Sequence, residues 1–318
     1  ISSSNQIWQW KELMTLISMI TAMIMLIPLS KTLLTFGVFK SLVKEIPKAL
    51  PRQNKNSKTI FWIIFFLGAL IACFSYIPMV DAAKYIFEDA TNRRMTWFYP
   101  QRMNNSVMLW AAFNGVIGIL LFTLSFQLFG KKHGVQSSSW GLKADSKYIL
   151  KTIILSLLVF TLYYSFLFLI YYIFHVDYRF WFMGVRVFQP EMLLVLAMYA
   201  PLFFIFFFSN SLRVNGAMRI EGQPEWKSMM IAGIANSLGL FLIILIQYIT
   251  FAKTGTVFWT TNWLSVNLLF AIVPMMFVLP YFNRYFFYMT GRVYLGPMVT
   301  TLVFIMILST NTVVYLPI

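Results

Sequence analysis

Residues 148–174 read YILKTIILSLLVFTLYYSFLFLIYYIF, a run of 27 residues with a single charged side chain, Lys151. A helix needs about 20 predominantly apolar residues to cross the hydrocarbon core of a bilayer, so this stretch predicts a membrane span. Seven further windows of this kind follow one another along the chain. The eight predicted spans cover about 13–36, 59–80, 106–130, 148–174, 192–211, 229–251, 263–283 and 294–316. The predicted fold class is therefore all-α, a polytopic transmembrane helix bundle in which residues 1–318 form one domain.

The basic residues between the predicted spans alternate in number and orient the bundle. Of the 25 Lys and Arg residues, 17 fall in the connections after the odd-numbered spans, which are 31–58, 131–151, 213–227 and 284–292. The positive-inside rule places these connections in the cytoplasm and both chain termini outside. The same loops predict contact with anionic lipid at the inner surface of the bilayer. We expect a multi-pass protein of the cell membrane.

The composition excludes a soluble globular domain. Hydrophobic residues make up 59% of the chain and charged residues 11%, whereas about a quarter of the residues in a soluble domain are charged. A net charge of +15 would indicate nucleic acid only if the basic residues gathered on one soluble face. They lie instead in short loops beside apolar helices, so we expect no nucleic-acid partner.

Uncharged amide side chains occur within or near the predicted spans. Hydrocarbon leaves an amide unpaired at a cost of several kcal/mol, so these side chains should face protein or a wet cavity. Small residues such as Gly115, Gly118 and Gly233 predict that helix backbones approach each other closely. The candidate interior amides are Asn114, Asn236, Gln247, Asn267 and Asn311.

The sequence contains few residues or motifs that could support catalysis or ion coupling. All ten acidic residues fall at span ends or in connections, which argues against a proton- or cation-driven pump. His133 and His175 lie on opposite sides of the predicted membrane, and no zinc-ligand spacing, nucleophile elbow or phosphate-binding loop occurs. We expect no metal and no cofactor. One acid–base candidate is His175 with Asp177 in the outer connection 175–191, although an amphipathic cap over the bundle explains this connection more simply.

Two cytoplasmic connections have more specific sequences than a spacer needs. The first connection covers residues 210–227 and contains the string NSLRVNGAMRIEGQPEW at 210–226. The second covers residues 283–296, which read NRYFFYMTGRVYLG and end in the string TGRVYLG. Their arginine and glutamate side chains can pair at the inner surface and tie the fifth to eighth spans together; a regulatory site is the alternative. The candidate ties are Arg213, Arg219, Glu221, Glu225 and Arg292.

These two strings, together with QIWQWKE at 6–12, resemble a group of Gram-positive bacterial membrane proteins described as α/β-hydrolases. In that group an N-terminal anchor and an extracytoplasmic hydrolase domain precede a multi-span C-terminal region. The resemblance covers essentially the whole chain and implies a hydrolase domain upstream of Ile1. An outside N-terminus that begins with Ile and has no signal peptide agrees with this expectation. No catalytic residue carries over, because the nucleophile of the family would lie in the upstream domain.

Three functions remain open at this stage. The first is a non-catalytic membrane domain that anchors or assists an esterase- or peptidase-like hydrolase outside the membrane. The second is a permease or lipid-handling subunit, which would enclose a cavity lined by the interior amides. The third is a lipid enzyme that uses His175 and Asp177.

Overall fold

The described part of the chain is predominantly helical, which confirms the all-α class for these residues. A computed structural model describes residues 24–49, 66–68, 70–71, 74–75, 102–125, 140–174, 190–222, 224–238 and 273–311. The long helices are α5 (Arg102–Ser125), α6 (Ser146–Phe174), α7 (Pro190–Leu212), α10 (Val273–Thr290) and α11 (Leu295–Asn311). Shorter helices cover Ile24–Thr35, α2 (Gly37–Lys40), the π-helix η7 (Arg213–Ala217) and residues 225–238.

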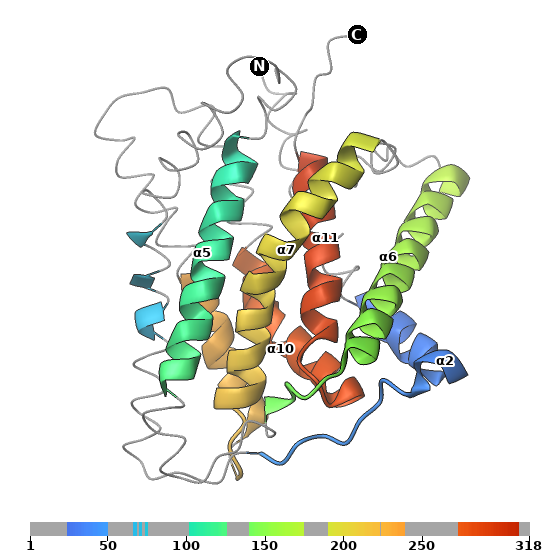
Figure 1. Cartoon of the computed structure of the whole chain (residues 1–318). Helices are drawn as coiled ribbons and strands as arrows, with labels where there is room; N and C mark the ends of the chain where they lie inside the picture. The colour runs from blue at the N-terminus through green and yellow to red at the C-terminus, as the bar shows by residue number, and fades with distance from the viewer. Residues whose placement is uncertain are drawn as a thin grey trace, which may run out of the picture.

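The long helices lie side by side in one bundle (Figure 1). Helix α5 packs on α7, α7 packs on α11, and α11 contacts both α6 and α10. Helix α6 begins at the end of the bundle where α7 ends, so these two helices run in opposite directions (Figure 1).

Five of the predicted spans overlap long helices, although α10 continues to Thr290, beyond the predicted end of its span at residue 283. The spans at 106–130, 148–174, 192–211, 263–283 and 294–316 overlap α5, α6, α7, α10 and α11. Among the described residues, one helix segment, Ser146–Tyr163, is both long and apolar enough to cross a membrane, and Ile24–Thr35 and Leu109–Leu121 are apolar but shorter. The remaining predicted spans, 13–36, 59–80 and 229–251, are described only in part.

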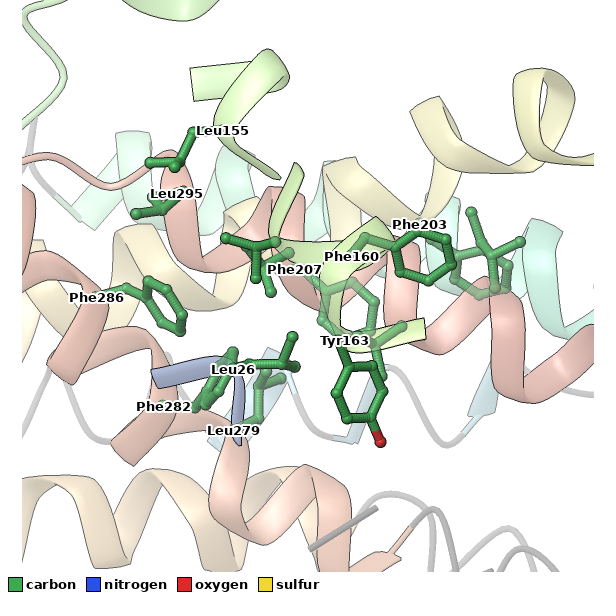
Figure 2. Close-up of a cluster of buried hydrophobic side chains, with 14 of the residues drawn as sticks. Leu26, Leu155, Phe160, Tyr163, Phe203, Phe207, Leu279, Phe282, Phe286 and Leu295 are labelled. Atoms are coloured by element: carbon green, nitrogen blue, oxygen red, sulfur yellow. The ribbon is translucent and has the colours of Figure 1, made fainter. Parts of the chain in front are cut away.

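Large apolar side chains from distant parts of the sequence form the core. Figure 2 shows Leu155 and Phe160 of α6 in the same cluster as Phe203 of α7, and this cluster extends to α10, α11 and the first helix. The rings of Phe282 and Phe286 are 4.6 Å apart between centroids and meet edge to face, the arrangement that aromatic pairs favour.

Glycines set the spacing between helices where the sequence predicts close approach. A Cβ atom on Gly115 of α5 would lie 2.7 Å from the backbone of Ile205 and Phe206 on α7. A Cβ atom on Gly233 would lie 2.5 Å from the carbonyl oxygen of Phe277 on α10. Both distances are shorter than any real Cβ contact, so the predicted close packing is confirmed at these positions.

Candidate functional site

The basic connections meet at one end of the bundle. The backbone N–H of Lys44 donates to Thr290 O at 3.2 Å, and Arg219 donates through Nη2 to Pro47 O. These two bonds join the loop after the first helix to the loops that follow α7 and α10. The loop before α6 joins the same layer, because Arg292 Nε donates to Lys143 O at 2.6 Å.

A cluster of buried polar residues lies between α7 and α10, next to the basic loops at this end of the bundle. Asn283 Nδ2 donates to Asn210 Oδ1 at 3.1 Å. Asn215 Nδ2 donates to Ser211 Oγ at 3.2 Å and to Asn283 O at 3.4 Å. Each of these side chains is about 1% exposed. We call this set, with Arg219 and Arg284, the Asn–Arg cluster.

The end of α7 explains why an arginine belongs in this cluster. A helix leaves its last carbonyl groups without intrahelical partners, and a buried carbonyl needs a donor. Here α7 continues into the π-helix η7, and Arg284 Nη2 donates to Val214 O in that segment at 2.7 Å. The side chain of Arg284 is 2% exposed. It therefore fastens α10 to the turn that ends α7.

Glu225 and Tyr288 form the rim of the cluster. The hydroxyl of Tyr288 donates to Glu225 Oε1, and the Arg219 guanidinium lies 5.0 Å from the centre of the Phe287 ring, within cation–π range. Burial lowers the pKa of Arg284, while the negative charge of Glu225 opposes this shift. Burial also raises the pKa of Tyr288, and its hydrogen bond to Glu225 adds to the effect.

Two of the five candidate ties, Arg219 and Arg292, join loops, and they do so through partners other than the glutamates expected. Arg219 and Arg292 bond to main-chain carbonyl groups, and Arg213 Nε donates to Ser209 O within its own helix at 3.4 Å. Glu225 accepts from Tyr288 and lies in electrostatic range of Arg219. Glu221 is exposed in the turn after η7.

Two of the candidate interior amides donate hydrogen bonds to residues outside their own helices. Asn114 Nδ2 donates to Trp110 O in its own helix at 2.7 Å and to Ser75 Oγ at 3.4 Å. Asn236 Nδ2 donates to Met276 O on α10 at 3.4 Å. Asn311 ends α11, and its side chain is outside the described part. Gln247, Asn267, His175 and Asp177 also lie outside the described residues.

The sequence-based candidates leave out four members of this region, although all four lie in the connections 210–227 and 283–296: Asn210, Asn283, Arg284 and Tyr288. A signal was present, because Asn210 and Asn283 stand at the ends of two predicted spans that share one side of the membrane. An amide at such a position on each of two helices can pair across the interface. Arg284 and Tyr288 follow at the spacing of one helical turn, which places them on a common face.

The Asn–Arg cluster offers hydrogen-bond donors and positive charge. No group of three His, Cys, Asp or Glu side chains among the described residues could hold a metal ion. Ser211 Oγ donates to Val293 O at 3.1 Å, so its proton is committed to the backbone. Comparison with protein-family models, with curated proteins and with solved structures gives no match.

Proposed function

We propose that this chain is a multi-pass membrane domain, itself non-catalytic, that anchors an extracytoplasmic hydrolase domain in the cell membrane. The observation that carries the membrane part is the outer face of α6. The hydrolase part rests on the resemblance of the strings at 210–226 and 290–296 to membrane proteins of the α/β-hydrolase group.

Helix α6 exposes mainly large apolar side chains, with Thr161 and Ser165 among them, and it carries further hydroxyl groups on the face that it buries. On the buried face, Thr152 Oγ1 donates to Tyr148 O and Ser156 Oγ donates to Thr152 O. A helix on the surface of a soluble protein has the opposite arrangement. The large exposed side chains are Leu150, Ile153, Ile154, Leu157, Leu158, Leu162, Phe166, Leu169 and Ile173.

The length of this exposed stripe matches a bilayer. From Leu150 to Ile173 the helix rises by roughly 35 Å at about 1.5 Å per residue, and the hydrocarbon core of a bilayer is about 30 Å thick. A face of that length formed mainly by large apolar side chains is suited to lipid chains. Lys147 and Lys143 lie exposed just before it, where they can reach phospholipid headgroups.

The described amides favour an anchoring role over a permease. The side chains of Asn114 and Asn236 donate within and between helices, so they contribute to packing. A permease that used them to line a passage would need these groups to face a wet cavity.

Spin labels on single cysteines test the membrane part. The native Cys73 is first replaced by Ser, and labels are then placed at Leu150, Leu157 and Leu169. In lipid nanodiscs, we expect these labels to be accessible to oxygen and protected from a water-soluble nickel reagent. A label at Lys143 is the control and should be accessible to nickel. Nickel access at Leu157 equal to that at Lys143 would contradict a lipid-facing α6.

Reading the gene upstream of the Ile1 codon tests the hydrolase part. An open reading frame that continues into a hydrolase-coding region supports the proposal, and a start codon within a few residues with no such region removes it. If the hydrolase is present, its activity should sediment with membranes in the full-length protein. The same domain expressed without residues 1–318 should lose part or all of that association.

A further inference from the structure

Two buried guanidinium groups in the Asn–Arg cluster use only part of their hydrogen-bonding capacity. Arg219 is 4% exposed and Arg284 is 2% exposed. Each donates through Nη2 to one main-chain carbonyl, Pro47 O for Arg219 and Val214 O for Arg284. Nε and Nη1 of both residues meet no acceptor in hydrogen-bonding geometry among the described residues. The Tyr288 hydroxyl, which lies near the Arg284 guanidinium, is a neutral partner that donates its own proton to Glu225.

Such groups are costly to leave unpaired. An arginine keeps its proton in a protein, so it cannot avoid the cost by becoming neutral. A buried charge without full pairing destabilises the fold, and a neutral carbonyl satisfies one N–H without balancing the charge. The two guanidinium groups therefore provide four buried nitrogens that are suited to an additional acceptor.

The local charge is also unbalanced. Glu225 and Tyr288 are in electrostatic range of both arginines, and the charge of Arg219 itself acts on Arg284. Among the described residues, one carboxylate, that of Glu225, therefore acts on both arginines. Glu225 is already an acceptor for the Tyr288 hydroxyl. One further negative group would balance the second positive charge.

We propose that Arg219 and Arg284 together bind a phosphate group between the loops that follow α7 and α10. A phosphate offers several charged oxygens to planar guanidinium groups, which hold it through paired N–H bonds. The site lies at the basic end of the bundle, so the phosphate comes either from a phospholipid headgroup or from a soluble phosphate. This inference is independent of whether the chain anchors a hydrolase.

Thermal unfolding of the purified chain in detergent tests binding of soluble phosphate. We expect sodium phosphate to raise the unfolding midpoint by several degrees relative to sodium chloride at equal ionic strength. Arg219→Gln and Arg284→Gln should abolish this shift, even if either variant is less stable in chloride. Arg292→Gln is the matched control, because Arg292 is engaged with Lys143 O and Gly291 O, and it should keep the shift.

Glu225→Gln should change the phosphate-induced shift in the direction opposite to the arginine variants. It removes the competing negative charge while an amide oxygen can still accept from Tyr288. The phosphate-induced shift should become larger than in the wild-type protein. A purely structural role for these residues would lower stability in both salts and leave the difference between phosphate and chloride unchanged.

Native mass spectrometry distinguishes the two sources of the phosphate. The chain is reconstituted in vesicles of phosphatidylglycerol and phosphatidylcholine and then released into detergent. Phosphatidylglycerol retained by the wild type and by Arg292→Gln, but lost in Arg219→Gln, assigns the site to a lipid headgroup. A thermal shift with phosphate and no retained lipid assigns it to a soluble phosphate. The proposal is overturned if neither result occurs, or if Arg219→Gln behaves as the wild type in both measurements.

Discussion

Asn283 on α10 donates its side-chain amide to the side-chain oxygen of Asn210 on α7 at 3.1 Å, across 73 residues of sequence. Both side chains are about 1% exposed. The bond lies where the predicted spans end, at the level at which the basic loops close over the bundle. Since the two helices also meet through Arg284 and Val214, this end of the interface is fixed by directional bonds as well as by packing.

Loss of this amide pair should destabilise the bundle in a coupled way. We expect Asn283→Ala and Asn210→Ala each to lower the free energy of unfolding by about 1–2 kcal/mol, the range for a buried hydrogen bond between membrane helices. The double variant should cost less than the sum of the two. Thermal or denaturant unfolding in detergent measures the three values. Thr123→Ala is the control, because Thr123 is exposed and its hydroxyl donates to Ile119 O within its own helix. Strict additivity of the amide variants would contradict a direct bond.

Helix spacing at Gly115 should not tolerate an additional methyl group. In Gly115→Ala the new Cβ would meet the backbone of α7 at 2.7 Å, and backbone atoms cannot move aside as a side chain can. We expect a loss of about 1–3 kcal/mol in unfolding free energy, the usual cost of overpacking. Gly37→Ala is the matched control, since nothing lies within 4 Å of the place that its Cβ would occupy. Equal stability of the two variants would show that α5 and α7 do not approach each other at Gly115.

Two glycines with the same backbone conformation should respond differently to alanine. Gly222 has φ +69° with open space around it, and Gly291 has φ +64° with Glu45 O only 2.5 Å from the position of a Cβ. Gly222→Ala carries only the conformational cost, about 1–2 kcal/mol. Gly291→Ala also pushes the loop 41–49 away from the end of α10.

Limited proteolysis of the loop 41–49 separates these two effects. We expect the Gly291→Ala protein to be cleaved there faster than the wild type, and the Gly222→Ala protein to be cleaved at the wild-type rate. Identical cleavage of both variants would mean that Gly291 matters for its conformation alone.

Tyr288 should make stability fall at alkaline pH. Its pKa is raised above the ordinary value of 10.0 by burial and by Glu225. A group with a raised folded-state pKa contributes stability that is present below its unfolded pKa and is lost as pH rises through the folded pKa. We therefore expect the unfolding midpoint of the wild type to drop above pH 10, and Tyr288→Phe to reduce that drop. Arg219 and Arg284 face the same hydroxyl, so Arg292→Gln, which lies outside this group, serves as the control.

The sequence predicts the helices more readily than the contacts between them. A long apolar run such as 148–174 indicates a helix because hydrocarbon requires every backbone group to be bonded internally, and α6 spans Ser146–Phe174. Glycine spacing also predicts where helices come close. The apolar run and the glycine spacing are both local signals, since each can be recognised within one segment of the sequence.

The partners of the polar side chains depend on register between distant helices, which one sequence does not specify. The sequence predicts a glutamate partner for Arg219, which instead donates to Pro47 O, 172 residues away. In the sequence, Arg284 counts only as one basic residue of a cytoplasmic loop. In the structure it is buried against η7. Neither hydrogen bond can be predicted from the sequence, because every residue has a main-chain carbonyl group and the sequence does not show which one is the acceptor.

The bond between Lys44 and Thr290 has a consequence for biogenesis. The loop 41–49 is synthesised well before Thr290 and Gly291, on which it rests, because about 240 residues separate them in the chain. Until α10 has formed, this loop has no docking surface at the end of that helix. Assembly of the basic end is therefore a late event, and a chain truncated before α10 would expose the loop to quality-control proteases.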